Sequence, residues 1–151
     1  MSKYAVLSTN HVGLVVEDLD RFLKIMTELF DYTVIDRGPR EVSVQSKVTN
    51  CPQAQVEIAY ITGGGFTLEV LCYAHTEGIK LYKPRVVDVG HWHLSINIED
   101  ISKVRIAAKS YGLCEIGELI TVGNGPNKGN QIIYLCTPEG IVIELTQQFH
   151  S

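Results

Sequence analysis

The chain of 151 residues is long enough for one domain of ordinary size, or for two small modules that share a core. Its thirteen basic and seventeen acidic residues give a net charge of -4 without a block of like charge, so neither a nucleic acid nor an anionic membrane surface is the expected partner. No stretch approaches the roughly 18 continuous apolar residues of a membrane span. We therefore expect a cytoplasmic protein that acts on a small molecule.

The first predicted elements begin at "HVGLVVEDLDRF", residues 11–22. Alternation of Val12, Leu14 and Val16 predicts a strand, and Asp18 is placed to cap the helix that follows. That helix has apolar residues at helical spacing, namely Leu19, Phe22, Leu23, Met26 and Phe30. Three further strands are predicted over about 32–37, 55–61 and 66–72, with an irregular stretch at 37–54.

The second half repeats the first. "HLSINIEDISKV" at 93–104 repeats the opening stretch at an offset of 82, and "GIVIEL" at 140–145 repeats "GFTLEV" at 65–70 at an offset of 75. The repeat predicts a strand over 94–98, an Asp100 cap, a helix over 101–111 ended by Gly112, and strands over about 114–119, 131–136 and 141–147. Each half therefore has the element order βαβββ.

This order defines the predicted fold class, which is α+β. We expect a single domain over residues 1–151, with module one at about 1–74, a linker at about 75–90 and module two at about 91–151. The two tandem βαβββ modules are expected to form a curved mixed sheet around a trough.

Four polar residues are predicted to lie on the face of the sheets that the helices leave uncovered. Because successive side chains of a strand alternate between faces, His11 and His93 point away from the apolar set, as do Glu69 and Glu144. A buried unpaired carboxylate is costly, and a metal ion removes that cost. Two imidazoles and two carboxylates suit one divalent ion, Zn, Ni, Co, Mn or Fe(II), better than calcium. The neighbouring His91 is expected to lie outside the ligand set, and no organic cofactor site is predicted.

The paired motifs "HVGLVVEDLDRF", "GFTLEV", "HLSINIEDI" and "YLCTPEGIVIEL" resemble the vicinal oxygen chelate superfamily, the group of glyoxalases, bleomycin-resistance proteins and extradiol dioxygenases. The resemblance covers nearly the whole chain and implies metal ligands at His11, Glu69, His93 and Glu144. Extradiol dioxygenases and fosfomycin-resistance enzymes resemble a scheme of two histidines and one glutamate, so four ligands favour the glyoxalase I and epimerase types. The resemblance also implies a homodimer.

The leading functional hypothesis is a metal-dependent epimerase, isomerase or glyoxalase-like lyase. It would transfer a proton next to a carbonyl of a small oxygenated substrate, with Glu69 and Glu144 as the candidate catalytic bases. Sugar-like and cyclitol ketones, thioesters and aldehydes are all candidate substrates. One alternative is a metal-free protein that sequesters a drug or metabolite, as bleomycin-resistance members do. A second alternative is an extradiol-type Fe(II) dioxygenase.

Overall fold

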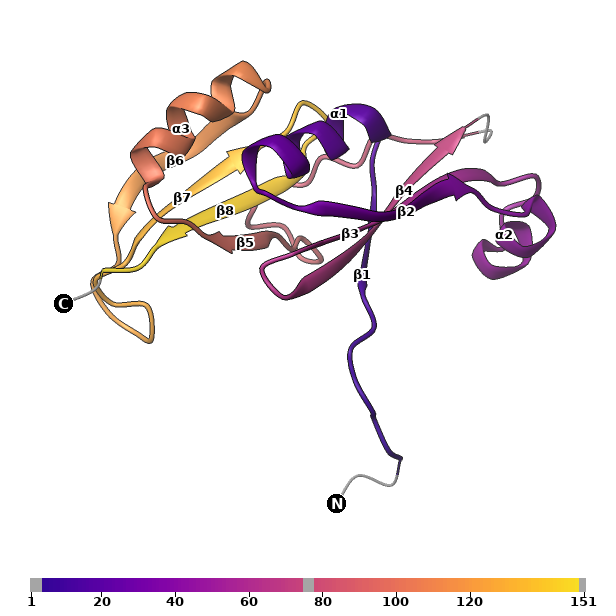
Figure 1. The fold of residues 1–151 in the computed structure, drawn as a ribbon, viewed down its shortest axis with the longest axis horizontal. Helices are drawn as coiled ribbons and strands as arrows, with labels where there is room; N and C mark the ends of the chain where they lie inside the picture. Colours follow the sequence, from indigo (N-terminus) through magenta and orange to yellow (C-terminus); the bar gives the residue numbers. More distant parts are fainter. Residues whose placement is uncertain (1–3, 75–77, 150–151) are drawn as a thin grey trace. The chain divides into compact units, whose positions relative to one another are not determined.

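The computed structural model describes residues 4–74 and 78–149. It divides into two compact units, Met1–Ile79 and Lys80–Ser151, and each unit contains one four-stranded mixed sheet (Figure 1). The predicted α+β class and the two βαβββ modules are therefore confirmed. The boundary between the units falls within the predicted linker, of which residues 75–77 lie outside the described residues, as do 1–3 and 150–151 of the predicted domain.

Unit 1 consists of β1 (Val12–Val15), α1 (Leu19–Lys24), the π-helix η1 (Ile25–Leu29), β2 (Thr33–Pro39), α2 (Val42–Thr49), β3 (Gln55–Gly63) and β4 (Phe66–Ala74). The strand order is β1-β4-β3-β2. β1 runs parallel to β4, and the other two pairs are antiparallel. The first and last strands of the unit are thus direct neighbours.

Unit 2 consists of β5 (Leu94–Asn97), α3 (Ile101–Ser110), β6 (Cys114–Thr121), β7 (Gln131–Cys136) and β8 (Val142–Gln147). Its order, β5-β8-β7-β6, and its strand directions repeat those of unit 1. Within the described ranges, no helix is long and apolar enough to cross a membrane.

Both predicted helix caps are present. The Asp18 carboxylate accepts a hydrogen bond from the Arg21 backbone N–H at 2.9 Å, and Asp100 accepts one from Lys103 at 3.0 Å. Each bond satisfies an amide that the first turn of a helix leaves without a partner. These caps fix where each helix leaves its histidine strand.

The α2 helix corrects the predicted irregular stretch at 37–54. None of its residues is buried, and Val44 and Val48 are exposed. A helix without a buried apolar stripe gives no periodic signal in the sequence, which is why the hydrophobic pattern did not reveal it. α2 ends at Asn50, whose φ of 53° lies in the left-handed region.

The two halves differ in length at definable places. The offset between equivalent residues is 82 at the helix starts, Leu19 and Ile101, and 81 where the chain turns left-handed after each helix, at Asp31 and Gly112. Unit 1 therefore has one extra residue within its helix, where η1 replaces ordinary α-helix. The offset falls to 74 at Tyr60 and Tyr134, so unit 1 has seven more residues in the segment that contains α2. The hairpin between the last two strands is one residue longer in unit 2, which makes the offset 75 at Glu69 and Glu144.

Each helix packs on one face of its own sheet. In unit 1 the buried side chains of Phe22 and Met26 belong to the helix, and those of Leu68 and Val70 belong to the facing side of β4. In unit 2 the corresponding buried residues are Ile101 and Ala108 on α3 and Ile143 and Leu145 on β8. The alternation of side chains then directs Glu69 and Glu144 to the opposite face of each sheet.

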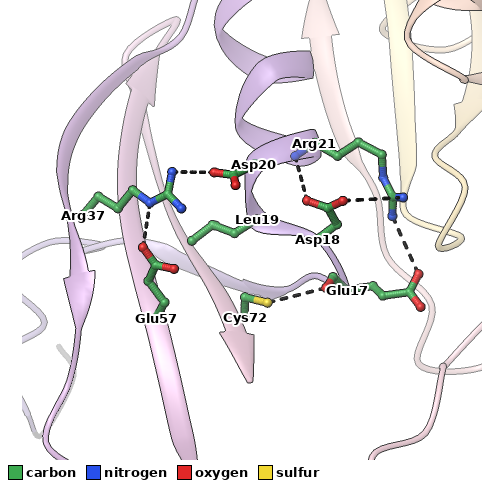
Figure 2. Close-up of a pocket in the computed structure, with 8 residues that line it drawn as sticks. All are labelled: Glu17, Asp18, Leu19, Asp20, Arg21, Arg37, Glu57 and Cys72. Carbon is green, nitrogen blue, oxygen red and sulfur yellow. Dashed lines mark hydrogen bonds and ion pairs between the residues drawn. The ribbon is translucent and has the colours of Figure 1, made fainter. Parts of the chain in front are cut away.

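An arginine links helix to sheet in each unit. Arg37 of β2 donates to Asp20 of α1 at 2.6 Å and to Glu57 of β3 at 2.7 Å (Figure 2). In unit 2, Arg105 of α3 makes two hydrogen bonds to Glu115 of β6, at 2.8 and 2.7 Å, which lower the pKa of that carboxyl group. Such solvent-accessible pairs stabilise by about 1 kcal/mol or less, so they orient the helices more than they drive folding.

We expect Gly63→Ala to destabilise unit 1. A Cβ at this position would stand 2.6 Å from two ring carbons of the buried Tyr32. Overpacking of this kind costs about 1–3 kcal/mol, which urea unfolding followed by circular dichroism would measure. Gly123→Ala is the control, because its Cβ would meet no atom within 4 Å. Equal midpoints for the two variants would contradict the packing of Tyr32 on Gly63.

Candidate functional site

The first candidate pair lies at the junction of β1 and β4. Gly13 of β1 pairs in register with Glu69 of β4, and His11 precedes Gly13 by two residues, on the same side of the strand. His11 Nε2 lies 3.2 Å from Glu69 Oε2, and both side chains are half-buried. The parallel register thus brings a histidine and a glutamate from opposite ends of the unit together.

The second candidate pair has the same construction. Ser95 of β5 pairs in register with Glu144 of β8, and His93 precedes Ser95 by two residues. His93 Nε2 lies 3.3 Å from Glu144 Oε2. Within the described part of either unit, no group of three or more His, Cys, Asp or Glu side chains suited to a metal ion occurs. The two pairs belong to different units, and one ion shared by all four residues stays a prediction.

The chemistry of each pair fits a divalent cation. His11 Nδ1 donates to the Asn10 side-chain oxygen at 2.5 Å, so that in the neutral ring Nε2 has the lone pair and faces the Glu69 carboxylate. Two acceptors at this distance repel each other unless a proton or a metal ion lies between them. Two ligands about 2.1 Å from one ion, at angles of about 90–110°, are about 3.0–3.4 Å apart, the range into which both pairs fall.

Two tyrosines that the sequence analysis missed complete the pairs. Tyr60 of β3 pairs with Glu69 across the sheet, and its hydroxyl donates to Glu69 Oε1. Its ring meets the His11 ring edge-on, with centroids 5.5 Å apart. Tyr134 of β7 pairs with Glu144, and its ring lies edge-on to His93 with centroids 4.9 Å apart. The recurrence of tyrosine in the third strand of both halves was the available signal.

Both phenols are neutral near neutral pH. The hydrogen bond to Glu69 is the main cause that raises the pKa of Tyr60, and burial is the main cause that raises the pKa of Tyr134. A neutral phenol remains a hydrogen-bond donor, so Tyr60 can hold the Glu69 carboxylate in place.

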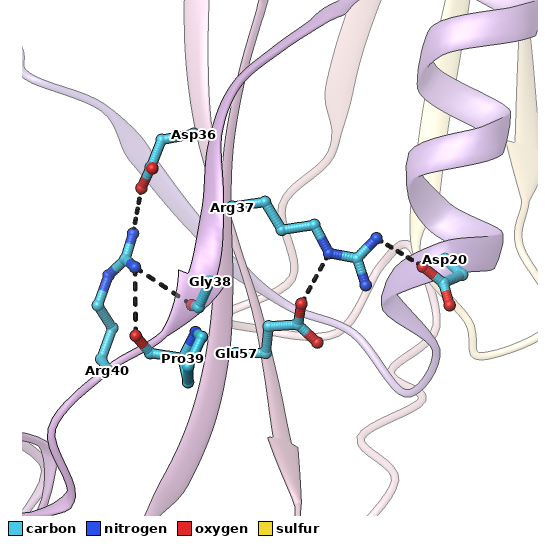
Figure 3. Close-up of polar contacts among 7 residues, drawn as sticks. All are labelled: Asp20, Asp36, Arg37, Gly38, Pro39, Arg40 and Glu57. Atoms are coloured by element: carbon cyan, nitrogen blue, oxygen red, sulfur yellow. Dashed lines mark hydrogen bonds and ion pairs between the residues drawn. The ribbon is translucent and has the colours of Figure 1, made fainter.

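The row of side chains in unit 1 continues to the outer strand. Asp36 of β2 pairs with Tyr60, and Arg40 contacts the Asp36 carboxylate and donates to the backbone oxygens of Gly38 and Pro39 at 3.2 and 3.4 Å. Figure 3 shows Arg40 and Arg37 on opposite sides of β2. Arg37 therefore belongs to the helix side of the sheet, and Arg40 to the side of the His11–Glu69 pair.

Hydroxyl groups hold the second glutamate. Glu144 Oε1 accepts hydrogen bonds from Ser95 Oγ at 2.8 Å and from Thr146 Oγ1 at 3.1 Å. Neither hydroxyl belongs to the site predicted from the sequence. Both contacts follow from register, since Ser95 pairs with Glu144 and Thr146 follows it by two residues on the same side of β8.

His91 lies next to the second pair. Its ring stacks on that of His93, with centroids 6.3 Å apart and an interplanar angle of 29°. Its Nε2 is buried and has no hydrogen-bond partner among the residues that the structure describes. The expectation that His91 lies outside the ligand set stays a prediction.

A pocket of about 480 Å³ lies on the other side of the unit 1 sheet, where α1 begins (Figure 2). It is lined by residues 17–21 with Arg37, Glu57 and Cys72. Its arginines bind neighbouring carboxylates: Arg37 binds Asp20 and Glu57, while Arg21 lies 3.6 Å from Glu17. The polar groups of this pocket thus tie the helix to the strands, and the His11–Glu69 pair is on the opposite face.

The duplicated βαβββ fold and its two histidine–glutamate pairs define the class of this protein. The chain belongs to the Glyoxalase/Bleomycin resistance protein/Dioxygenase superfamily, whose sequence profile matches residues 8–145. It is 29% identical, over 154 aligned positions, to a 2-epi-5-epi-valiolone epimerase from an Actinomyces species, with 92% of this chain and 78% of that protein covered.

Solved structures share the fold. A glyoxalase family protein from Bacillus cereus superposes with a TM-score of 0.85 at 23% identity, covering 99% of each chain. The fosfomycin resistance protein FosX from Listeria monocytogenes, solved with Mn(II) and a sulfate ion, superposes with a TM-score of 0.61 at 12% identity, covering 96% of this chain and 95% of the other. These structures show the shared fold, and the family match over residues 8–145 confirms the predicted membership of the glyoxalase group.

Proposed function

We propose that this protein is a divalent-metal-dependent epimerase or related isomerase that moves a proton next to a carbonyl of a small oxygenated substrate. The observation that carries the proposal is the pair of repeat-related histidine–glutamate contacts, each spaced as two ligands of one cation are. The relative named as a 2-epi-5-epi-valiolone epimerase favours epimerisation over lyase action. It also directs the substrate search toward sugar-like and cyclitol ketones.

In this proposal His11, Glu69, His93 and Glu144 hold the metal. When bound, a divalent ion withdraws charge from a substrate carbonyl and so lowers the cost of removing the proton on the adjacent carbon. His11 presents Nε2 because its Nδ1 proton is held by Asn10. Both glutamates present Oε2 toward their histidine, while hydroxyl donors occupy Oε1.

The carboxylates are the proposed proton carriers. Epimerisation removes a proton from one side of a carbon and returns one to the other side, which requires two proton-transfer groups or one group that moves. The duplication supplies two, Glu69 and Glu144. A carboxylate accepts the proton from the C–H bond, the electron pair of that bond is delocalised onto the carbonyl oxygen, and the return of a proton to the same carbon restores the ketone.

Metal should stabilise the folded protein, and this response should depend on His93. Because the ion binds only the folded chain, a concentration of Zn(II), Ni(II), Co(II) or Mn(II) about 100 times Kd adds about 2.7 kcal/mol, seen as a higher Tm that a chelator reverses. His93→Ala should abolish this stabilisation, and the control His91→Ala should retain it. If no ion changes the Tm of the wild type, and His93→Ala makes no difference to this result, metal binding is refuted.

Carboxylate-dependent exchange of substrate protons with solvent should report the reaction. In D₂O the metal-loaded protein should introduce deuterium next to the carbonyl of a substrate found by screening cyclic polyhydroxy ketones, aldehydes and thioesters by NMR. Glu69→Gln and Glu144→Gln should each reduce the exchange rate by about 100-fold or more, since an amide oxygen can still ligate but cannot accept the proton. Oxygen consumption would instead indicate a dioxygenase, and stoichiometric binding without exchange would indicate a sequestering protein.

The proposal includes a homodimer. β1 and β2 are the edge strands of the unit 1 sheet, and the side chains of Tyr4, Val6 and Leu7, just before β1, are exposed. Edges and apolar side chains of this kind are commonly covered by a second subunit. Sedimentation velocity at micromolar concentration should give a dimer mass, and a monomer across that range would contradict the expectation.

A further inference from the structure

The two glutamates of the proposed site are held by different numbers of hydroxyl groups. Glu144 Oε1 accepts from Ser95 at 2.8 Å and from Thr146 at 3.1 Å, and these two hydroxyls are themselves 3.3 Å apart. Glu69 Oε1 accepts from Tyr60. The common feature is that hydrogen bonds occupy Oε1 and leave Oε2 directed toward the histidine. The difference is that the hydroxyls of Ser95 and Thr146 hold Glu144, which Tyr134 also approaches, whereas among the described residues Tyr60 alone donates to Glu69.

The difference is encoded at two equivalent positions. Gly13 stands opposite Glu69 in the parallel register where Ser95 stands opposite Glu144, and Leu71 follows Glu69 by two residues where Thr146 follows Glu144. Neither Gly13 nor Leu71 has a hydroxyl to offer. Unit 1 therefore has the strand geometry of unit 2 without its two nearest donors.

Steric crowding does not account for the glycine. A Cβ built on Gly13 would lie 3.5 Å from Glu69 Oε2 and 3.7 Å from a methyl group of Leu71, both ordinary contact distances. A serine at this position would therefore place its hydroxyl beside the Glu69 carboxylate, on the Oε2 side, whereas Ser95 donates to Oε1 of Glu144. The backbone at residue 13 can therefore accommodate a side chain, and Glu69 lacks a hydroxyl donor there because the residue is glycine.

Resting on the proposed function, we infer that Ser95 and Thr146 are positioning residues that make Glu144 the firmly held metal ligand, and that Gly13 leaves Glu69 the more mobile one. Two hydrogen bonds to one carboxylate oxygen restrict the rotation of that carboxylate. Glu69, restrained by one phenol, is freer to turn away from the ion and accept a proton from substrate. The duplicated site is thus divided into a fixed half and a movable half.

The test adds and removes single hydroxyls and measures binding of Zn(II) and Co(II) alone, by competition with a chromophoric chelator. Ser95→Ala should weaken binding by about 10- to 100-fold, the usual effect of removing a group that orients a ligand, and Ser95→Thr should restore it. Gly13→Ser should tighten binding several-fold over wild type by adding the donor that Glu69 lacks. Gly13→Ala is its matched control, with the Cβ and without the hydroxyl, and should bind as wild type does or more weakly.

Folding and function are separated by two further readings. Circular dichroism in the presence of chelator establishes that each variant is folded. If wild type binds the ions and Gly13→Ser binds no tighter than Gly13→Ala, or Ser95→Ala binds as wild type does, the unequal positioning is wrong while the proposed function stands. If wild type binds neither ion, the proposed function and this inference fall together.

Discussion

The parallel pairing of the first and last strand in each unit is the constraint on which the site depends. It places Gly13 beside Glu69 and Ser95 beside Glu144, across 49 residues in the second case. A slip of one residue in this register would turn the carboxylate to the helix side and leave the histidine facing a hydrophobic residue. The buried residues on the helix side, among them Leu68 and Leu145, oppose such a slip because they would move to the other face. The core therefore enforces the geometry of the polar side.

Duplication supplies a symmetric frame, and single residues make its halves unequal. The helix caps, the left-handed turns after the helices, the histidines, the glutamates and the third-strand tyrosines occur in both units. The helix-to-sheet arginines do not correspond, since Arg37 lies on a strand and Arg105 on a helix. The hydroxyls around the glutamates do not correspond either. The residues that set the shared fold thus differ from those that distinguish the two halves. One fold can therefore serve the several activities of a superfamily.

Much of the fold could be predicted because its signals are periodic and occur twice. The alternation in the histidine strands, the Asp18 and Asp100 caps and the paired glutamate strands each confirm one another between the halves. The α2 helix could not be predicted, because Val44 and Val48 face solvent and no stripe records the helical period. Tyr60 escaped notice for another reason. Its role depends on which residue of β4 lies opposite, and the length of the β3–β4 hairpin decides that register.

The extra residue within the first helix shows how the fold accommodates a change in length. η1 widens one turn of the helix, so that Phe22 and Met26 on either side of the junction stay buried and the chain leaves the helix at Asp31 as it does at Gly112 in unit 2. The added residue is absorbed locally, and neither the helix–sheet packing nor the strand that follows has to change. The same insertion in a strand would move every later side chain to the other face of the sheet, whereas here its effect ends within η1. The histidine and glutamate strands of the two halves thus keep the same register although the helices between them differ in length.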